Sequence, residues 1–147
     1  MYLVDTDVIS ESRKGDGANA GVRAFFRKAS LDDEPLYISA ITVGELRRGV
    51  EKVRHRGDIQ QASRLERWLL LVVEQYGDAI LTFDGEIAQV WGRLRVPHSE
   101  NPLDKQIAAT ALIHDLTVVT RNVADFVATG VRLMDPFFPQ RQRVVAS

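Results

Sequence analysis

The stretch LVDTDVISES, residues 3–12, leads from an apolar segment directly onto two aspartates. Residues 1–5 have the pattern of a short buried strand. Asp5 and Asp7 follow at the point where that strand ends, and the next residues can form a short helix. A carboxylate in this position can cap a helix, bind a metal ion or act as a nucleophile. Other features of the sequence are needed to choose among these roles.

The composition is that of an ordinary globular protein. The chain has 147 residues, which is enough for one domain with a buried core. Its net charge of −1 creates no overall field that would attract nucleic acid, so any such binding needs a local basic patch. There is no cysteine, which excludes disulfides, thiolate metal ligands and a thiol nucleophile.

The apolar segments do not suggest a membrane protein. The longest apolar run, residues 68–73, is far too short to cross a bilayer. Asp5 and Asp7 stand where the apolar part of a signal peptide would lie, so we expect no signal peptide. Together with the absence of cysteine, these features predict a cytoplasmic protein that does not bind a membrane.

Strand and helix patterns alternate along the chain. Strands are predicted over residues 1–5, 35–39, 79–83, 116–120 and 130–134, and helices over 18–30, 42–55, 59–76, 85–95 and 103–115. This alternation predicts an α/β fold in which a parallel sheet of four or five strands is sandwiched between helices. We expect one domain over residues 1–137 and a flexible tail over 138–147.

Acidic residues gather where the predicted strands end. Asp5 ends the first strand, Glu45 lies near the start of the helix after the second, and Asp104 lies in the first turn of the helix before the fourth. Thr120, Arg121 and Asn122 end the fourth strand, and Asp125 follows one helical turn later. Ligands of such sheets bind at the carboxyl ends of the strands. Carboxylates that meet there would repel one another unless a cation neutralised them, and an all-oxygen cluster suits Mg²⁺ or Mn²⁺.

Each acid also has a purely structural explanation. Asp5 or Asp7 can cap the helix that follows. Thr42-x-x-Glu45 matches a capping box, in which the glutamate bonds back to the backbone. The helix dipole favours Asp104 in a first turn, and Asp125 can be a solvated turn residue. Singly, these explanations are at least as good as a functional role, and only the joint pattern favours a site.

The chain resembles the PIN-domain ribonucleases, and most closely the VapC and FitB type of toxin from bacterial toxin–antitoxin pairs. The motifs that carry the resemblance are LVDTDVISE, ISAITVGELRRGV, PLDKQIAATALIHDLTVVTRNVADF and VRLMDPF, which together span about residues 1–137. The resemblance implies a PIN-like fold and RNA cleavage that depends on Mg²⁺ or Mn²⁺. It also assigns the family's acidic positions to Asp5, Glu45 and Asp104.

Two positions depart from part of the family. Many members have an acid directly after the Thr-Arg pair, where this chain has Asn122. Either Asp125 then serves as the fourth acid, or Asn122 holds a metal-bound water through its amide oxygen. Asp7 stands where relatives often have asparagine, and we expect it to order the loop by hydrogen bonds. Thr6 and Thr120 resemble the family's hydroxyl residues beside the acids.

These residues receive roles in a predicted hydrolytic site. Asp5 and Asp104 are expected to bind the metal ion directly, and Glu45 to bind it directly or through water. Arg121 is expected to contact RNA, and the basic residues among 47–56 are equally well explained as phosphate contacts or as a solvated helix face. The resemblance further implies a cognate antitoxin. Because the apolar residues 68–73 cannot all face one core, we expect a homodimer that captures an antitoxin segment on this surface.

Two other functions remain open at the level of sequence. VDTDV also resembles the opening motif of haloacid-dehalogenase-like phosphatases, in which the first aspartate, here Asp5, is the nucleophile. That interpretation leaves Glu45 without a role. A catalytically silent binding module with a PIN-like fold is the second alternative, and the retained acids argue against it.

Overall fold

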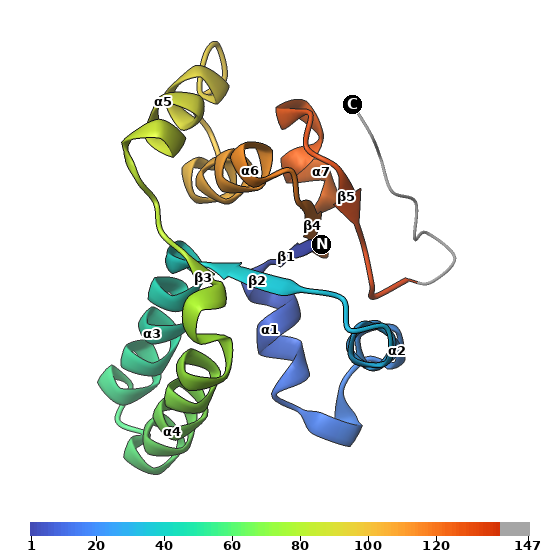
Figure 1. The fold of residues 1–147 in the computed structure, drawn as a ribbon. Coiled ribbons are helices and arrows are strands. Elements are labelled where there is room, and N and C mark those ends of the chain that lie inside the picture. The colour runs from blue at the N-terminus through green and yellow to red at the C-terminus, as the bar shows by residue number, and fades with distance from the viewer. Residues whose placement is uncertain (139–147) are drawn as a thin grey trace.

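A computed structural model describes residues 1–138, in which five short strands form one parallel sheet (Figure 1). The spatial order of the strands is β3-β2-β1-β4-β5, and their bounds are Tyr2–Val4 (β1), Leu36–Ser39 (β2), Ile80–Leu81 (β3), Thr117–Val119 (β4) and Leu133–Met134 (β5). In register, Leu3 of β1 lies opposite Tyr37 on one side and Val118 on the other. The predicted parallel sheet and its α/β class are therefore confirmed.

Seven α-helices within the described residues connect and cover the strands. Their bounds are Thr6–Ser12 (α1), Ala20–Leu31 (α2), Ala40–His55 (α3), Ile59–Tyr76 (α4), Gly85–Leu94 (α5), Pro102–His114 (α6) and Val123–Phe126 (α7). Helices α1 to α4 lie on one side of the sheet and α5 to α7 on the other (Figure 1). The chain therefore folds as three layers, with the sheet in the middle.

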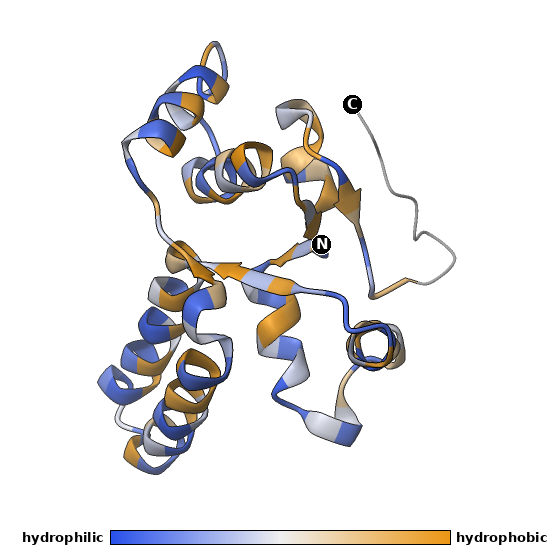
Figure 2. Ribbon diagram, viewed as in Figure 1, coloured by the Kyte–Doolittle hydropathy of each residue, from blue (hydrophilic) through white to orange (hydrophobic). Residues whose placement is uncertain are grey.

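Each face of the sheet has its own apolar core. Val4 and Val119 pack with residues of α1 to α4 in one buried cluster. Leu3 and Val118 point to the opposite face and pack with residues of α6 and α7 in a second cluster. Successive residues of a strand face opposite sides, so two neighbouring apolar residues serve two cores. In Figure 2, hydrophobic and hydrophilic residues alternate along α3 and α4, as expected for helices with one buried face.

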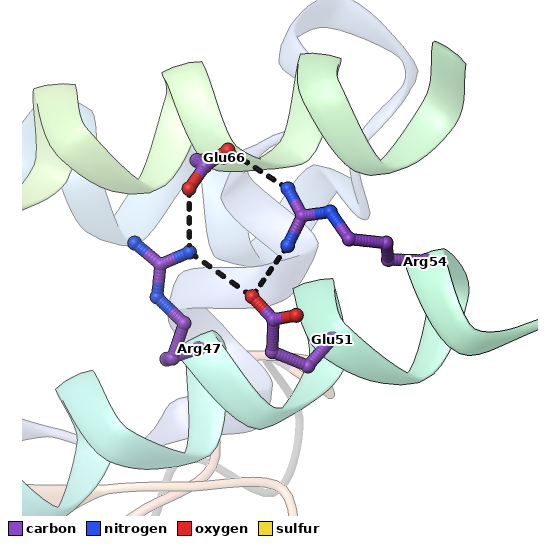
Figure 3. Close-up of polar contacts among 4 residues, drawn as sticks. All are labelled: Arg47, Glu51, Arg54 and Glu66. Atoms are coloured by element: carbon purple, nitrogen blue, oxygen red, sulfur yellow. Dashed lines mark hydrogen bonds and ion pairs between the residues drawn. The ribbon is translucent and has the colours of Figure 1, made fainter. Parts of the chain in front are cut away.

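The helices α3 and α4 form an antiparallel pair that is joined by ion pairs on its outer face (Figure 3). Glu66 of α4 binds Arg47 and Arg54 of α3 at 2.8 Å each, and Glu51 contacts the same two arginines. Arg47 and Arg54 are therefore engaged within the protein, which favours the helix-face explanation for these two members of the basic run. Such partly exposed pairs stabilise a fold by about 0–1 kcal/mol each.

The described chain contains no helix that is long and apolar enough to cross a membrane. Phe138 is exposed and is the last described residue. The rest of the predicted tail, residues 139–147, lies outside the part of the chain that the structure describes.

Candidate active site at the carboxyl edge of the sheet

Asp5 lies at the centre of the site, between the ends of β1 and β4. Its backbone N–H donates to the Val119 carbonyl at 2.9 Å, which continues the pairing of the two strands. Its side chain caps α1, since Oδ1 accepts from the Thr6 N–H at 2.8 Å. Oδ2 accepts from the Thr120 hydroxyl at 2.8 Å. Asp5 is only 4% exposed, so a capping role and a place in the site coexist in one residue.

Asp7 connects α1 to the end of β4. Its Oδ2 accepts from the backbone N–H of Arg121 at 3.0 Å. Its Oδ1 is buried and has no hydrogen-bond partner among residues 1–138. A buried carboxylate oxygen without a donor or a cation is costly, which marks this position as one that a positive charge would stabilise.

Glu45 takes no part in capping α3, so the capping-box interpretation of Thr42-x-x-Glu45 was wrong. The helix begins at Ala40, and the Ser39 hydroxyl caps it by accepting from the Ile41 N–H at 3.0 Å. Thr42 is thus buried inside the helix, where its hydroxyl accepts from Thr6 at 3.2 Å. Glu45 lies one turn further along and is half-buried, because the helix begins two residues earlier than the predicted start at residue 42.

Asp104 lies in the first turn of α6 on the other side of the sheet. Asn101, in a left-handed backbone conformation with φ of 53°, and Pro102, at the first helical position, define the start of this helix. The next residue, Lys105, is buried, and its ammonium donates to the carbonyl of His98 in the preceding loop. The buried Lys105 thereby fixes the loop that leads into Asp104.

The carboxylates interact although they come from different elements. Burial raises the pKa of Asp5, and the nearby charge of Glu45 raises it further. Burial, together with the charges of Asp5, Asp125 and Glu45, raises the pKa of Asp104 to about 6. Burial and the charges of Asp5 and Asp104 raise the pKa of Asp7 to about 7. All five acids therefore belong to one electrostatic cluster.

The end of β4 brings its own polar residues to this cluster. The Thr120 hydroxyl donates to Asp5 and accepts from the Asn122 N–H at 3.0 Å, so it orients the acid and the following turn together. Asp125 lies in the short helix α7, exposed, yet near enough for its charge to act on Asp104. Both candidates for the fourth position therefore lie at this edge of the sheet: Asn122 in the turn after β4, and Asp125 one helical turn further.

The donor set fits a hard divalent cation in its chemistry. It consists of carboxylate oxygens only, one of which, Asp7 Oδ1, is buried without a partner. An added cation would also reverse the unfavourable charge interactions that raise the pKa values of Asp5, Asp7 and Asp104. Across residues 1–138, however, no group of three or more Asp, Glu, His or Cys side chains has the arrangement of a formed metal site. The side chains would have to draw together on a cation.

Two site residues were missed from the sequence. Ser39 both ends β2 and caps α3, and Thr42 supports Thr6 beneath the acids. A serine directly after a strand pattern and before a helix is a standard start signal, and it was available in the sequence. The burial of Thr42 had no such signal, because the threonine also fitted a cap.

Comparison with known proteins places this geometry in a family. The sequence profile described as PIN domain matches residues 2–130. Toxin FitB of Neisseria gonorrhoeae (strain ATCC 700825 / FA 1090) is 35% identical over 145 residues, which cover 93% of this chain and 99% of that protein. VapC ribonuclease Y4jK of Sinorhizobium fredii (strain NBRC 101917 / NGR234) is 34% identical over 146 residues, with 95% of this chain and 99% of that protein covered.

Solved structures agree with the sequence matches. The crystal structure of FitAcB from Neisseria gonorrhoeae has a TM-score of 0.80 to this fold at 34% identity, and covers 93% of this chain and 99% of that chain. A toxin–antitoxin complex from Klebsiella pneumoniae has a TM-score of 0.60 at 25% identity, with 92% and 98% covered. The resemblance predicted from the motifs is confirmed over nearly the whole length of these relatives. The chain belongs to the PIN domain family.

Proposed function

We propose that this protein is the toxin of a type II toxin–antitoxin pair and that it acts as a metal-dependent endoribonuclease. The observation that carries the proposal is the single electrostatic cluster formed by Asp5, Glu45, Asp104 and Asp125, which come from four different elements. The names of the similar proteins, a toxin and a ribonuclease, support the same activity.

The acids are proposed to hold Mg²⁺ or Mn²⁺ for hydrolysis of an RNA phosphodiester bond. Asp5 and Asp104 are the proposed direct ligands, and Glu45 is a further ligand, directly or through water. When bound, the cation would lower the pKa of a coordinated water molecule and draw charge from the phosphate oxygens.

Neighbouring residues orient the acids and add negative charge to the site. Thr120 and the Thr6 N–H each donate to one oxygen of Asp5, so the carboxylate is held in one orientation. Thr6 is itself bonded to the buried Thr42 of α3, the helix that carries Glu45. Asp125 adds negative charge beside Asp104, which strengthens the attraction for a cation.

Neither alternative function accounts for the site as well. A phosphatase with Asp5 as nucleophile would leave Glu45, whose charge acts on Asp5 and Asp104, without a role. A silent binding module does not need to keep acids whose pKa values are raised by burial and by one another's charge. Membership in the PIN domain family favours the nuclease over both.

An antitoxin is the proposed partner, in keeping with the toxin–antitoxin complex among the similar structures. The chain offers apolar surface on α4, where Leu70 and Leu71 are 56% and 63% exposed while their neighbours Leu69 and Val72 are buried. We propose that this surface supports a homodimer or the antitoxin segment.

The decisive experiment removes the charge of one proposed ligand at a time. Asp5→Asn and Asp104→Asn should lose Mn²⁺-dependent cleavage of RNA, while Asp16→Asn, at an exposed acid in the turn after α1, should keep it. EDTA should abolish the wild-type activity, and circular dichroism should confirm that all three variants fold. Full RNA cleavage by both Asp5→Asn and Asp104→Asn would refute the proposed site. Turnover of a small phosphomonoester through a covalent bond to Asp5 would favour the phosphatase.

A further inference from the structure

The segment after β5 docks against α2 through an unusually close contact. Asp135 follows the strand, is 9% exposed, and its Oδ1 accepts from the Phe137 N–H at 2.9 Å, which closes a tight turn. The Pro136 carbonyl then lies against Gly21 in the first turn of α2, where a Cβ atom would come within 2.0 Å of the oxygen. Only glycine admits this approach.

The turn places the Phe137 ring in the core on the α2 side of the sheet. The side chain is 7% exposed and packs in the same cluster as Val4 of β1 and Phe25 of α2. In Figure 1 the chain runs from β5 down toward α2 on this side of the molecule. Phe137 is therefore fixed at three points: by its own burial, by the Asp135 turn and by the Gly21 contact.

The guanidinium of Arg121 contacts this ring. Its guanidinium carbon lies 4.8 Å from the centroid of Phe137, within the range of a cation–π contact. Its backbone N–H donates to Asp7 of the acidic cluster. The residue is thus held at both ends, its backbone at the acids and its side chain on an aromatic face.

With its guanidinium carbon over the Phe137 ring, Arg121 can stack on the aromatic face and keep the donors along its edge available. A guanidinium bonds to phosphate through N–H groups in its own plane, and stacking occupies only its face. Arg121 is exposed, and its charge acts on Glu11 of α1, whose pKa is lowered chiefly by Lys14 and to a lesser degree by Arg121. The backbone of Arg121 therefore lies at the cluster, while its guanidinium acts on the α1 side, where Glu11 lies, and leaves the carboxylates of the cluster free for a cation.

The need for such a group follows from the charge of the site. The net charge of the chain is −1, and five carboxylates gather where RNA has to approach. A polyanion is repelled there unless a fixed positive charge lies close by. Immobilising an arginine costs side-chain entropy, and the contact with the Phe137 ring meets part of that cost before RNA binds.

We propose that Phe137 is a positioning residue that holds the Arg121 guanidinium as a fixed contact for an RNA phosphate on the α1 side of the acidic cluster. The inference rests on the proposed ribonuclease function, because it assigns the recognition of that substrate. It gives the VRLMDPF motif a role in substrate binding, through the turn at Asp135 and the docking at Gly21.

The test compares Arg121→Gln, Phe137→Leu and the double variant with the wild type. Cleavage of a single-stranded RNA oligonucleotide with Mn²⁺ gives kcat and KM. Fluorescence anisotropy of the same RNA in EDTA, over a series of KCl concentrations, gives the salt dependence of binding. Phe25→Leu is the matched control, since Phe25 is 8% exposed in the same core cluster and its ring contacts are with Tyr2 and Phe26.

Arg121→Gln should raise KM roughly tenfold with kcat little changed, the loss expected for one charge-assisted contact. It should also reduce the slope of log K against log[KCl] by about 0.7, the value for one phosphate on a single strand. Phe137→Leu should shift KM and slope in the same direction, Phe137→Tyr should restore them, and the double variant should be no worse than Arg121→Gln. Phe25→Leu should lower thermal stability alone.

Several outcomes would overturn the inference. These are an unchanged KM and slope in Arg121→Gln, effects of Phe137→Leu that add to those of Arg121→Gln, and a Phe25→Leu variant that behaves like Phe137→Leu. If Phe137→Leu does not fold, Arg121→Lys replaces it: it keeps the charge without a planar group, and a KM equal to that of the wild type would count against stacking. Loss of antitoxin binding in Arg121→Gln with unchanged RNA binding would assign the arginine to the partner instead.

These results separate the inference from the proposed function. Cleavage by the wild type with equal KM values in all variants would leave the ribonuclease standing and remove the role of Phe137. RNA binding that weakens as described in a protein that cleaves nothing would support the phosphate contact and refute the ribonuclease.

Discussion

The ionised side chain of Asp7 is both incompletely hydrogen-bonded and repelled by neighbouring acids. One of its oxygens holds the backbone of Arg121, and the other is buried without a partner in residues 1–138. Burial and the charges of Asp5 and Asp104 raise its pKa from 3.8 to about 7. Ionised Asp7 therefore works against folding until a cation arrives, and protonated Asp7 does not.

The stability of the metal-free protein should consequently depend on pH. A carboxyl group whose pKa is raised on folding contributes stability that is fully present below about pH 4 and is lost as the pH rises through about 7. Asp7→Asn removes this contribution while its amide oxygen still accepts from Arg121. In EDTA at pH 8 we expect the variant to be more stable than the wild type, by on the order of 1–2 kcal/mol after allowance for solvent.

Urea unfolding at a series of pH values measures this difference. The two stability curves should converge near pH 4 and separate toward pH 8, and Asp16→Asn should follow the wild type throughout. Parallel curves for Asp7→Asn and the wild type would show that Asp7 carries no such strain.

At the scale of single elements, the cap of α3 controls the position of an acid. Ser39 is 1% exposed and caps the helix whose second turn carries Glu45. Ser39→Ala should lower the free energy of unfolding by about 1 kcal/mol, because a helical N–H loses its acceptor. It should also lower kcat for RNA cleavage, because the turns leading to Glu45 would become less well fixed.

Asp58 provides a matched cap without an acid behind it. Its side chain accepts from the Gln61 N–H at 3.2 Å at the start of α4. Asp58→Ala should lower stability by a similar amount and leave kcat unchanged. Urea unfolding and RNA cleavage assays on Ser39→Ala and Asp58→Ala measure both effects. An equal loss of kcat in the two variants would mean that capping affects activity only through general stability.

The elements also show where sequence patterns succeed and fail. The helix over residues 59–76 was predicted with its exact bounds, because an apolar stripe lies between Asp58, which caps it, and Gly77, which ends it with a φ of 47°. The strand predicted over 79–83 shrinks to Ile80–Leu81, since β3 is an edge strand that pairs only with the last two residues of β2. An apolar run does not reveal how far its neighbour extends.

Sequence patterns likewise predicted some features of the site and missed others. The acids at strand ends could be predicted because parallel strands end at one edge of the sheet. The error at Glu45 arose because the sequence contains two possible helix starts, one at Ser39 and one at Thr42. Local sequence does not show which of them caps the helix, since Ser39 is also the last residue of a strand. The Arg121–Phe137 contact was out of reach, since it depends on a close approach between segments that are far apart in the chain.

For the whole molecule, the exposed leucines of α4 give the clearest expectation. Leu70 and Leu71 point outward from a helix whose inner face already packs in the core through Leu69 and Val72. Replacing both by serine should weaken self-association or antitoxin binding by at least tenfold, because burial of a leucine side chain contributes about 2 kcal/mol to association. RNA cleavage per protomer should persist.

Analytical ultracentrifugation of the double variant, alone and with its antitoxin, provides the measurement. Leu31→Ser is a suitable control, since Leu31 is 78% exposed at the end of α2. If Leu70→Ser/Leu71→Ser assembles as the wild type does, this face of α4 is not an interface.

The division of the apolar residues into two cores has a consequence for how the site can move. Asp5 and Glu45 belong to elements packed on one face of the sheet, whereas Asp104 and Asp125 belong to helices packed on the other. The carboxylates therefore come from two layers on opposite faces of the sheet, which meet where Ile41 of α3 packs against the second core. A small sliding of one layer over the central strands would change the gap between Asp5 and Asp104, so the packing of the two cores sets how closely these acids can approach a cation.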